Sequence, residues 1–176
     1  IYVCITTAKD MVRHKQGQEF NKTHYYAHPE EYEPVFHKDV FPYTRVLVNC
    51  MYWDQKYPRL VTTQQARDLA LEGRCPCVAV GDITCDPKGS VQFFVQSTTI
   101  DEPLYVYNLL TGEISYDINS PGIVIQGVDH LPAEFPTQAT EFFGDQLMPF
   151  LRGVATSDGN LPWEEQDDLP ADVKRA

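Results

Sequence analysis

Residues 78–90 read VAVGDITCDPKGS and indicate both a fold class and the place of a site. An apolar run stops at Asp82, a second aspartate follows at Asp86, and a Pro-Lys-Gly turn closes the segment. In an open α/β sheet, ligands bind outside the carboxyl ends of the strands, so Asp82 would lie at the edge of a cofactor crevice. The alternative is that both aspartates are turn residues and that Asp86 starts the Pro-Lys-Gly turn.

Two further predicted strands end in polar or reactive residues. Residues 45–52 (RVLVNCMY) begin with a near-continuous apolar run, which is typical of a strand buried on both faces of a parallel sheet. Residues 122–128 (GIVIQGV) run directly into Asp129 and His130. If these strands and residues 77–83 are parallel neighbours, their polar ends meet along one edge of the sheet.

The connection between residues 45–52 and 77–83 favours parallel strands. Thr62 and Gln65 have the spacing of a capping box, so a helix is predicted from there to residue 70. A strand, a helix and a strand in this order form a crossover unit, which is expected to be right-handed with parallel strands. The predicted fold class is therefore α/β, a Rossmann-like parallel sheet with flanking helices.

The remaining elements are predicted from composition and periodicity. β-branched and aromatic residues predict strands over residues 1–6, 91–95 and 104–107. Apolar residues at spacings of three and four predict a helix over residues 139–151, with a kink or a break at Pro149.

Charge and composition exclude several classes of partner. The chain has 176 residues and a net charge of −11, which argues against a nucleic-acid backbone or an anionic membrane surface as the main ligand. A nucleotide cofactor is compatible with this charge, because it needs only local donors. No apolar run approaches the roughly 20 residues of a membrane helix.

The cysteines and histidines do not predict a metal site. Five cysteines and no visible signal peptide favour a reducing, intracellular setting. Cys75 and Cys77 lack a second Cys or His pair at zinc spacing. His24 and His28 are four residues apart, but Pro29 follows His28, and a residue before proline avoids the helical region.

Asp129 and His130 have two interpretations. Their side chains ionise near pH 4 and 6.5, so together they could bind or shuttle a proton. Alternatively, Asp129 caps the following helix and His130 packs. The sequence has no glycine-rich phosphate loop between a strand and a helix, so either no dinucleotide binds or that loop lies upstream of Ile1. The abrupt β-rich start at Ile1 favours a segment of a longer protein.

Several motifs, taken in order, resemble a known family. They are residues 42–44, 49–53, 58–62, 82–90, 98–103, 129–133 and 139–145. From about residue 28 to residue 151, the chain resembles the lysine–ketoglutarate reductase half of alpha-aminoadipic semialdehyde synthase. Lysine-forming saccharopine dehydrogenases and alanine dehydrogenases are more distant resemblances.

This resemblance implies a fold, a reaction and a division of the chain. The fold would be of the alanine-dehydrogenase type, and the reaction would condense lysine with 2-oxoglutarate and reduce the imine to saccharopine with NADPH. Residues 1–128 would be the later part of the nucleotide-binding domain, residues 129–155 a hinge and a helix returning to the substrate domain, and residues 156–176 an acidic tail. The family's phosphate loop and its acid/base Lys and His would lie upstream of Ile1, so the chain alone is not expected to be active.

The resemblance also implies site residues, partners and a compartment. Its cofactor-binding residues would be Cys50, Met51, Tyr52, Gly81, Asp82, Ile83, Asp86, Asp129, His130 and Leu131. The partners would be lysine, 2-oxoglutarate or saccharopine, NADP and the upstream half of the same protein, in mitochondria if the protein is of the animal type. Two alternatives stay open: an NAD-linked, lysine-forming saccharopine dehydrogenase, and a non-catalytic acidic interaction or regulatory module.

Overall fold

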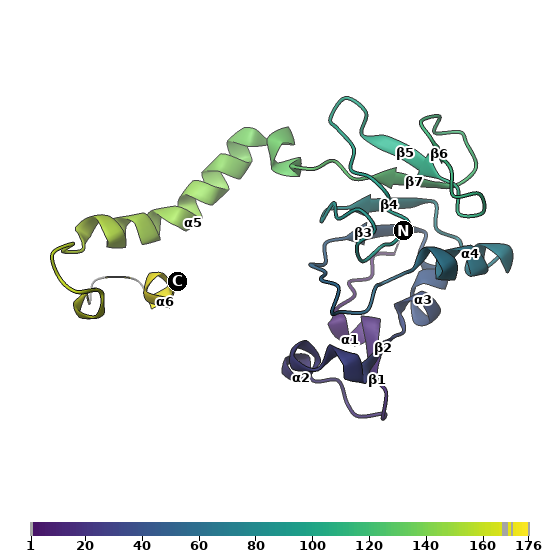
Figure 1. The fold of residues 1–176 in the computed structure, drawn as a ribbon. Helices are drawn as coiled ribbons and strands as arrows, with labels where there is room; N and C mark the ends of the chain where they lie inside the picture. The colour runs from purple at the N-terminus through teal and green to yellow at the C-terminus, as the bar shows by residue number, and fades with distance from the viewer. Residues whose placement is uncertain (1, 167–168, 170, 176) are drawn as a thin grey trace. The chain divides into compact units, whose positions relative to one another are not determined.

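The computed structural model describes residues 2–166, 169 and 171–175, in two compact units, Ile1–Asp129 and His130–Ala176, which are treated separately below. The main sheet of the first unit has five strands in the order β3-β4-β7-β5-β6 (Figure 1). The strands are β3 (Val46–Asn49), β4 (Ala79–Asp82), β5 (Leu104–Tyr107), β6 (Ile114–Ser115) and β7 (Ile123–Gln126).

Three neighbouring strands of this sheet are parallel. β3 pairs with β4, and β4 pairs with β7, both in the parallel sense, whereas β5 and β6 are antiparallel to their neighbours. This confirms the predicted α/β, Rossmann-like class and adds an antiparallel edge to it. Strand β3 is buried on one face only, with Leu47 and Asn49 buried and Val46 and Val48 exposed, so the expectation of burial on both faces was wrong.

The predicted crossover helix is present as α4 (Thr63–Leu71), between β3 and β4. The Thr62 hydroxyl accepts from the Gln65 backbone N–H at 3.1 Å, and the Gln65 side chain accepts from the Thr62 N–H at 2.9 Å. Both hydrogen bonds of the predicted capping box are therefore formed. Ala66 and Leu69 are buried on the core side of this helix.

A smaller antiparallel sheet and short helices precede β3. They are α1 (Ala8–Met11), β1 (Val12–His14), α2 (Lys22–Ala27), the 3-10 helix η1 (Pro29–Glu31), β2 (Tyr32–Pro34), α3 (Phe36–Asp39) and the 3-10 helix η2 (Phe41–Tyr43). The expected strand at residues 1–6 was wrong for its described part, since residues 2–6 have no regular structure and Val3 and Ile5 are exposed. Intrinsic β propensity does not hold a strand that has no neighbour to pair with.

Aromatic side chains from the loop between β4 and β5 fill part of the core. Phe93 and Phe94 are fully buried, although residues 91–95 form a turn with one isolated bridge and not the expected strand. The apolar residues that suggested a strand here are side chains of a loop that pack into the core. Gly127 fits against Phe94, because a Cβ there would lie 2.1 Å from the Phe94 ring.

The second unit is helical. It contains η3 (Leu131–Glu134), α5 (Pro136–Thr156), η4 (Trp163–Glu165) and α6 (Ala171–Arg175). Helix α5 continues through Pro149, so the helix does not break there, and the expected kink stays a prediction; a 21-residue helix tolerates the loss of one backbone hydrogen bond at this position. Asp167 and Asp168 of the expected acidic tail lie outside the described residues. The expected boundaries near residues 128 and 155 stay predictions.

Candidate cofactor site

The carboxyl ends of three strands meet at one edge of the main sheet. Asn49 at the end of β3 is in register with Asp82 at the end of β4, and Gly81 is in register with Gln126 of β7. The segments that follow these strands therefore leave the sheet at the same edge. The strand ends and the segments that follow them carry eight of the ten expected cofactor-binding residues: Cys50, Met51, Tyr52, Gly81, Asp82, Ile83, Asp86 and Asp129.

The Asp82 carboxylate is a buried acceptor. Asn49 Nδ2 lies 3.1 Å from each of its oxygens, and Oδ1 also accepts from the Thr84 hydroxyl at 2.6 Å. The backbone N–H groups of Thr84 and Cys85 donate to the same oxygen at 3.1 and 3.2 Å. These hydrogen bonds fix the start of the loop that follows β4, so Asp82 shapes this edge from inside the protein.

The three acidic residues at this edge gather near Cys85. Burial is the largest cause, followed by the charges of Asp82, Asp129 and Asp86, and together they raise the pKa of the Cys85 thiol to about 11. The thiol therefore stays protonated at neutral pH and is not a nucleophile. Burial likewise raises the pKa of Cys77 to about 12 and raises that of Cys75, so neither offers a thiolate.

A cavity of about 750 Å³ opens beside the end of β3. Its walls include the predicted Cys50, Met51 and Tyr52, together with residues 3–8 and 57–60. A volume of this size suits a small molecule or part of a cofactor. Residues 3–8 were not expected at this site, because a strand was predicted over residues 1–6.

Arg59 connects the loops after β3 and β4, and no role was predicted for it beyond its place in a motif of the family resemblance. Its guanidinium lies 4.2 Å from the centre of the Trp53 ring, and Nη1 donates to the carbonyl oxygens of Lys88 and Gly89. Desolvation lowers the pKa of Arg59. The side chain thus ties the turn at residues 86–89 to the loop that carries Tyr52.

Exposure separates the predicted residues into two groups. Tyr52 and Ile83 are exposed, as are Cys50, Asp86 and Asp129, whereas Asp82 is buried. His130 and Leu131 begin the second unit, and their expected position at this edge stays a prediction. His130 has a left-handed backbone conformation, φ 60°, which only a few per cent of non-glycine residues adopt.

The strand order and the polar edge define an α/β protein with a Rossmann-like sheet. A solved structure of an L-alanine dehydrogenase matches 76% of this chain and 32% of its own, with a TM-score of 0.50 and 18% sequence identity, which supports the same fold. No protein-family model matches the chain.

The relatives identify the segment more narrowly. The chain is 44% identical over its whole length to an alpha-aminoadipic semialdehyde synthase of Arabidopsis thaliana, and 35% identical over 91% of its length to the mitochondrial alpha-aminoadipic semialdehyde synthase of Bos taurus. It is 24% identical over 132 residues to a saccharopine dehydrogenase [NAD(+), L-lysine-forming] of Emericella nidulans, or 75% of this chain and 34% of that protein. The chain is thus homologous to one segment of the alpha-aminoadipic semialdehyde synthases, as its motifs predicted.

The match covers only part of these relatives. The chain spans 16% of the Arabidopsis protein and 19% of the bovine protein. Within the part of the chain that the structure describes, no helix has the length and apolar character needed to cross a membrane.

Proposed function

We propose that this chain forms part of the cofactor-binding domain of a lysine–ketoglutarate reductase, an NADP-linked oxidoreductase. The reaction condenses lysine with 2-oxoglutarate and reduces the imine to saccharopine. The observation that carries the proposal is the shared carboxyl edge of β3, β4 and β7, which bears the expected site residues of the first unit. Homology along the whole of this chain to one segment of an alpha-aminoadipic semialdehyde synthase supports the choice of reaction.

The residues at this edge fit a nicotinamide cofactor and a cationic substrate. Cys50 and Tyr52 follow β3, are exposed and line the cavity, so they would contact the cofactor. When bound, the nicotinamide supplies the hydride for reduction of the imine. The carboxylates of Asp86 and Asp129 favour positively charged groups nearby, such as the ammonium groups of lysine, and disfavour phosphates.

The same charge distribution favours a binding site for the cofactor phosphates away from this edge. A dinucleotide needs backbone N–H groups or cations for its pyrophosphate, and this acidic edge offers neither a glycine-rich turn nor a cluster of basic residues. We expect the phosphate loop and the acid/base residues in other parts of the longer protein. In this proposal, Asp82 and Arg59 are positioning residues for the two loops of the site.

The second candidate is an NAD-linked, lysine-forming saccharopine dehydrogenase. Its support is the similarity to fungal proteins of that name, such as the 29% identity over 124 residues to the one of Neurospora crassa. Both candidates place a nicotinamide at the same edge. They differ in whether the cofactor carries an additional phosphate on its ribose, as NADP does, and in the direction of the reaction. A mitochondrial location is a further proposal, supported by the names of the bovine and rodent relatives.

A segment exchange tests the proposal. The matching segment of the Arabidopsis relative is replaced by this chain, and oxidation of NADPH and of NADH is measured with lysine and 2-oxoglutarate, together and singly. The unaltered Arabidopsis protein is the control. We expect NADPH oxidation that requires both substrates. A folded exchange protein that oxidises neither cofactor would contradict the proposal and favour the non-catalytic module.

A further inference from the structure

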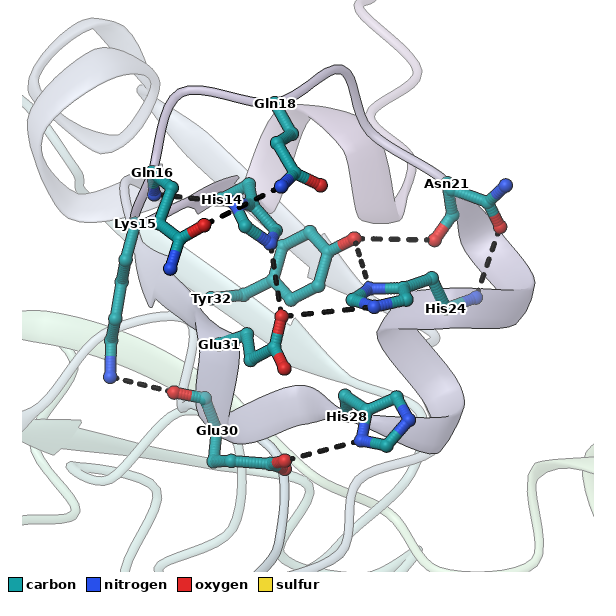
Figure 2. Close-up of polar contacts among 10 residues, drawn as sticks. All are labelled: His14, Lys15, Gln16, Gln18, Asn21, His24, His28, Glu30, Glu31 and Tyr32. Atoms are coloured by element: carbon teal, nitrogen blue, oxygen red, sulfur yellow. Dashed lines mark hydrogen bonds and ion pairs between the residues drawn. The ribbon is translucent and has the colours of Figure 1, made fainter.

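A second group of polar side chains lies around the small sheet, and the proposed function does not use it. His14 ends β1, His24 belongs to α2, and Glu31 ends η1 (Figure 2). The antiparallel register of β1 and β2 pairs His14 with Tyr32, which brings Glu31 next to the His14 ring. Helix α2 supplies His24, whose ring approaches the same Glu31 oxygen as the His14 ring in this view.

The ligand atoms of this group have the spacing of a coordination site. His14 Nε2 lies 3.2 Å from Glu31 Oε2, and His24 Nε2 lies 3.7 Å from the same oxygen. One ligand atom from each of the three residues lies within 4.8 Å of the others. Two ligands bound at about 2.0–2.2 Å to a tetrahedral ion lie roughly 3.5 Å apart, so small side-chain movements would complete the geometry.

We propose that His14, His24 and Glu31 bind a divalent transition-metal ion, of which Zn²⁺ is the best fit. Two imidazoles and one carboxylate match the preference of this class of ion, whereas Mg²⁺ and Ca²⁺ prefer oxygen ligands alone. Three protein ligands leave a fourth position for water. Such an ion would join β1, α2 and η1.

Contacts outside the ligand set orient His24 for this role. Tyr32 Oη lies 3.2 Å from His24 Nδ1 and donates to the Asn21 carbonyl at 3.5 Å. In the tautomer in which Nδ1–H donates to the phenol oxygen, the lone pair of His24 Nε2 lies on the side of Glu31. A lone pair and a carboxylate at 3.7 Å repel each other unless a cation lies between them. A proton on His24 Nε2 would compete with the metal ion for this position.

Metal binding requires the proton of the His14 ring to move from one ring nitrogen to the other. Its side chain is 1% exposed, and its Nδ1 accepts from the Gln16 backbone N–H at 3.2 Å, so without metal Nε2–H donates to Glu31. Coordination through Nε2 moves this proton to Nδ1 and breaks the bond from Gln16. We therefore expect a weaker site than one in which Nδ1 already donates to an acceptor.

A neighbouring group provides the matched control. His28, Glu30 and Glu31 also lie within 4.8 Å of one another, but all are more exposed than His14, and the His28 and Glu30 side chains are 52% and 68% exposed. Substitution of His28 keeps all three proposed ligands and removes only a ring that packs against His24, at a centroid distance of 5.1 Å.

The test is titration of the 176-residue chain with Zn²⁺ in excess Mg²⁺, by calorimetry and by the shift in thermal midpoint. The exposed thiols are removed by Cys4→Ser and Cys50→Ser, and Co²⁺ absorption reports whether any thiolate binds. We expect one ion per chain without thiolate ligation. His24→Gln and Glu31→Gln should each weaken binding at least about tenfold, and His28→Gln should leave it unchanged.

Three outcomes overturn the proposal. They are the absence of Zn²⁺ binding, a sulfur-ligand spectrum with Co²⁺, and equal weakening by His28→Gln and His24→Gln. His24 is 38% exposed, so His24→Gln should preserve the fold, and circular dichroism of each variant verifies this.

Discussion

Asn49 and Asp82 end two neighbouring parallel strands at the same level, and the amide Nδ2 of Asn49 lies 3.1 Å from both carboxylate oxygens of Asp82. Both side chains are buried, at 2% and 1% exposure. The same amide also lies 2.9 Å from the Ser90 hydroxyl. Hydrogen bonds from Asn49 thus connect the end of β3 to the end of β4 and to Ser90 in the loop that follows β4. They fix the edge of the sheet at which we place the cofactor.

Asn49→Ala should lower the free energy of unfolding by about 3 kcal/mol, because it leaves a buried carboxylate short of a donor. The control is Asn119→Ala, which removes an amide–carboxylate hydrogen bond of 3.0 Å at an exposed pair with Asp117. That change should cost less than about 0.5 kcal/mol. Urea unfolding of both variants measures the difference. Equal losses would contradict a structural role for the Asn49–Asp82 pair.

Gly127→Ala should destabilise the first unit, because the added Cβ would lie 2.1 Å from the buried Phe94 ring. Overpacking of this kind costs about 1–3 kcal/mol or more. Gly144→Ala in α5 is the matched change, since its Cβ meets no atom within 4 Å. There the better helix propensity of alanine should stabilise the helix by up to about 1 kcal/mol. Thermal unfolding gives both signs, and a stable Gly127→Ala would refute the close contact.

His37 should make the protein less stable in acid. Its Nδ1 is buried without a hydrogen-bond partner among the described residues, and desolvation lowers its pKa. The unfolded chain takes up the proton near pH 6.5 and the folded chain only at lower pH, so stability is full above about pH 6.5 and falls as the pH drops toward the folded pKa.

His37→Leu should remove this component, together with the cost of the unpaired nitrogen. The variant should gain stability over the parent as the pH falls from 7 to about 5, measured by urea unfolding at each pH. The control is His28→Leu, a change at an exposed histidine. A gain that does not depend on pH would show that protonation of His37 is not involved.

Local signals in the sequence predicted local structure well. The capping box of Thr62 and Gln65 was correct, because its atoms lie within one helical turn. The parallel strands followed from the order strand, helix and strand. By contrast, residues 2–6 and 91–95 have strand-forming composition without a strand, because pairing depends on neighbours that composition does not specify.

The candidate sites divide in the same way. Residues after β3 and β4 were found from strand ends, which a parallel sheet brings together. The burial of Asp82 was not predicted, because it depends on a hydrogen bond from Asn49, 33 residues earlier in the chain. The grouping of His14 with Glu31 also escaped prediction, since the pairing of β1 with β2 creates it. The spacing of His24 and His28 was not taken as a metal site, and the proposed site uses only His24 of these two residues.

The most direct test of the cofactor edge compares two tyrosines at opposite ends of β3. Tyr52 follows the strand and is 79% exposed, and Tyr43 precedes it and is 80% exposed. In the exchange protein, NADPH affinity is measured by fluorescence titration for Tyr52→Ala and Tyr43→Ala. We expect Tyr52→Ala to weaken binding about tenfold and Tyr43→Ala to leave it unchanged. Unchanged binding in Tyr52→Ala, or an equal loss in both variants, would contradict a cofactor at the carboxyl ends of the strands.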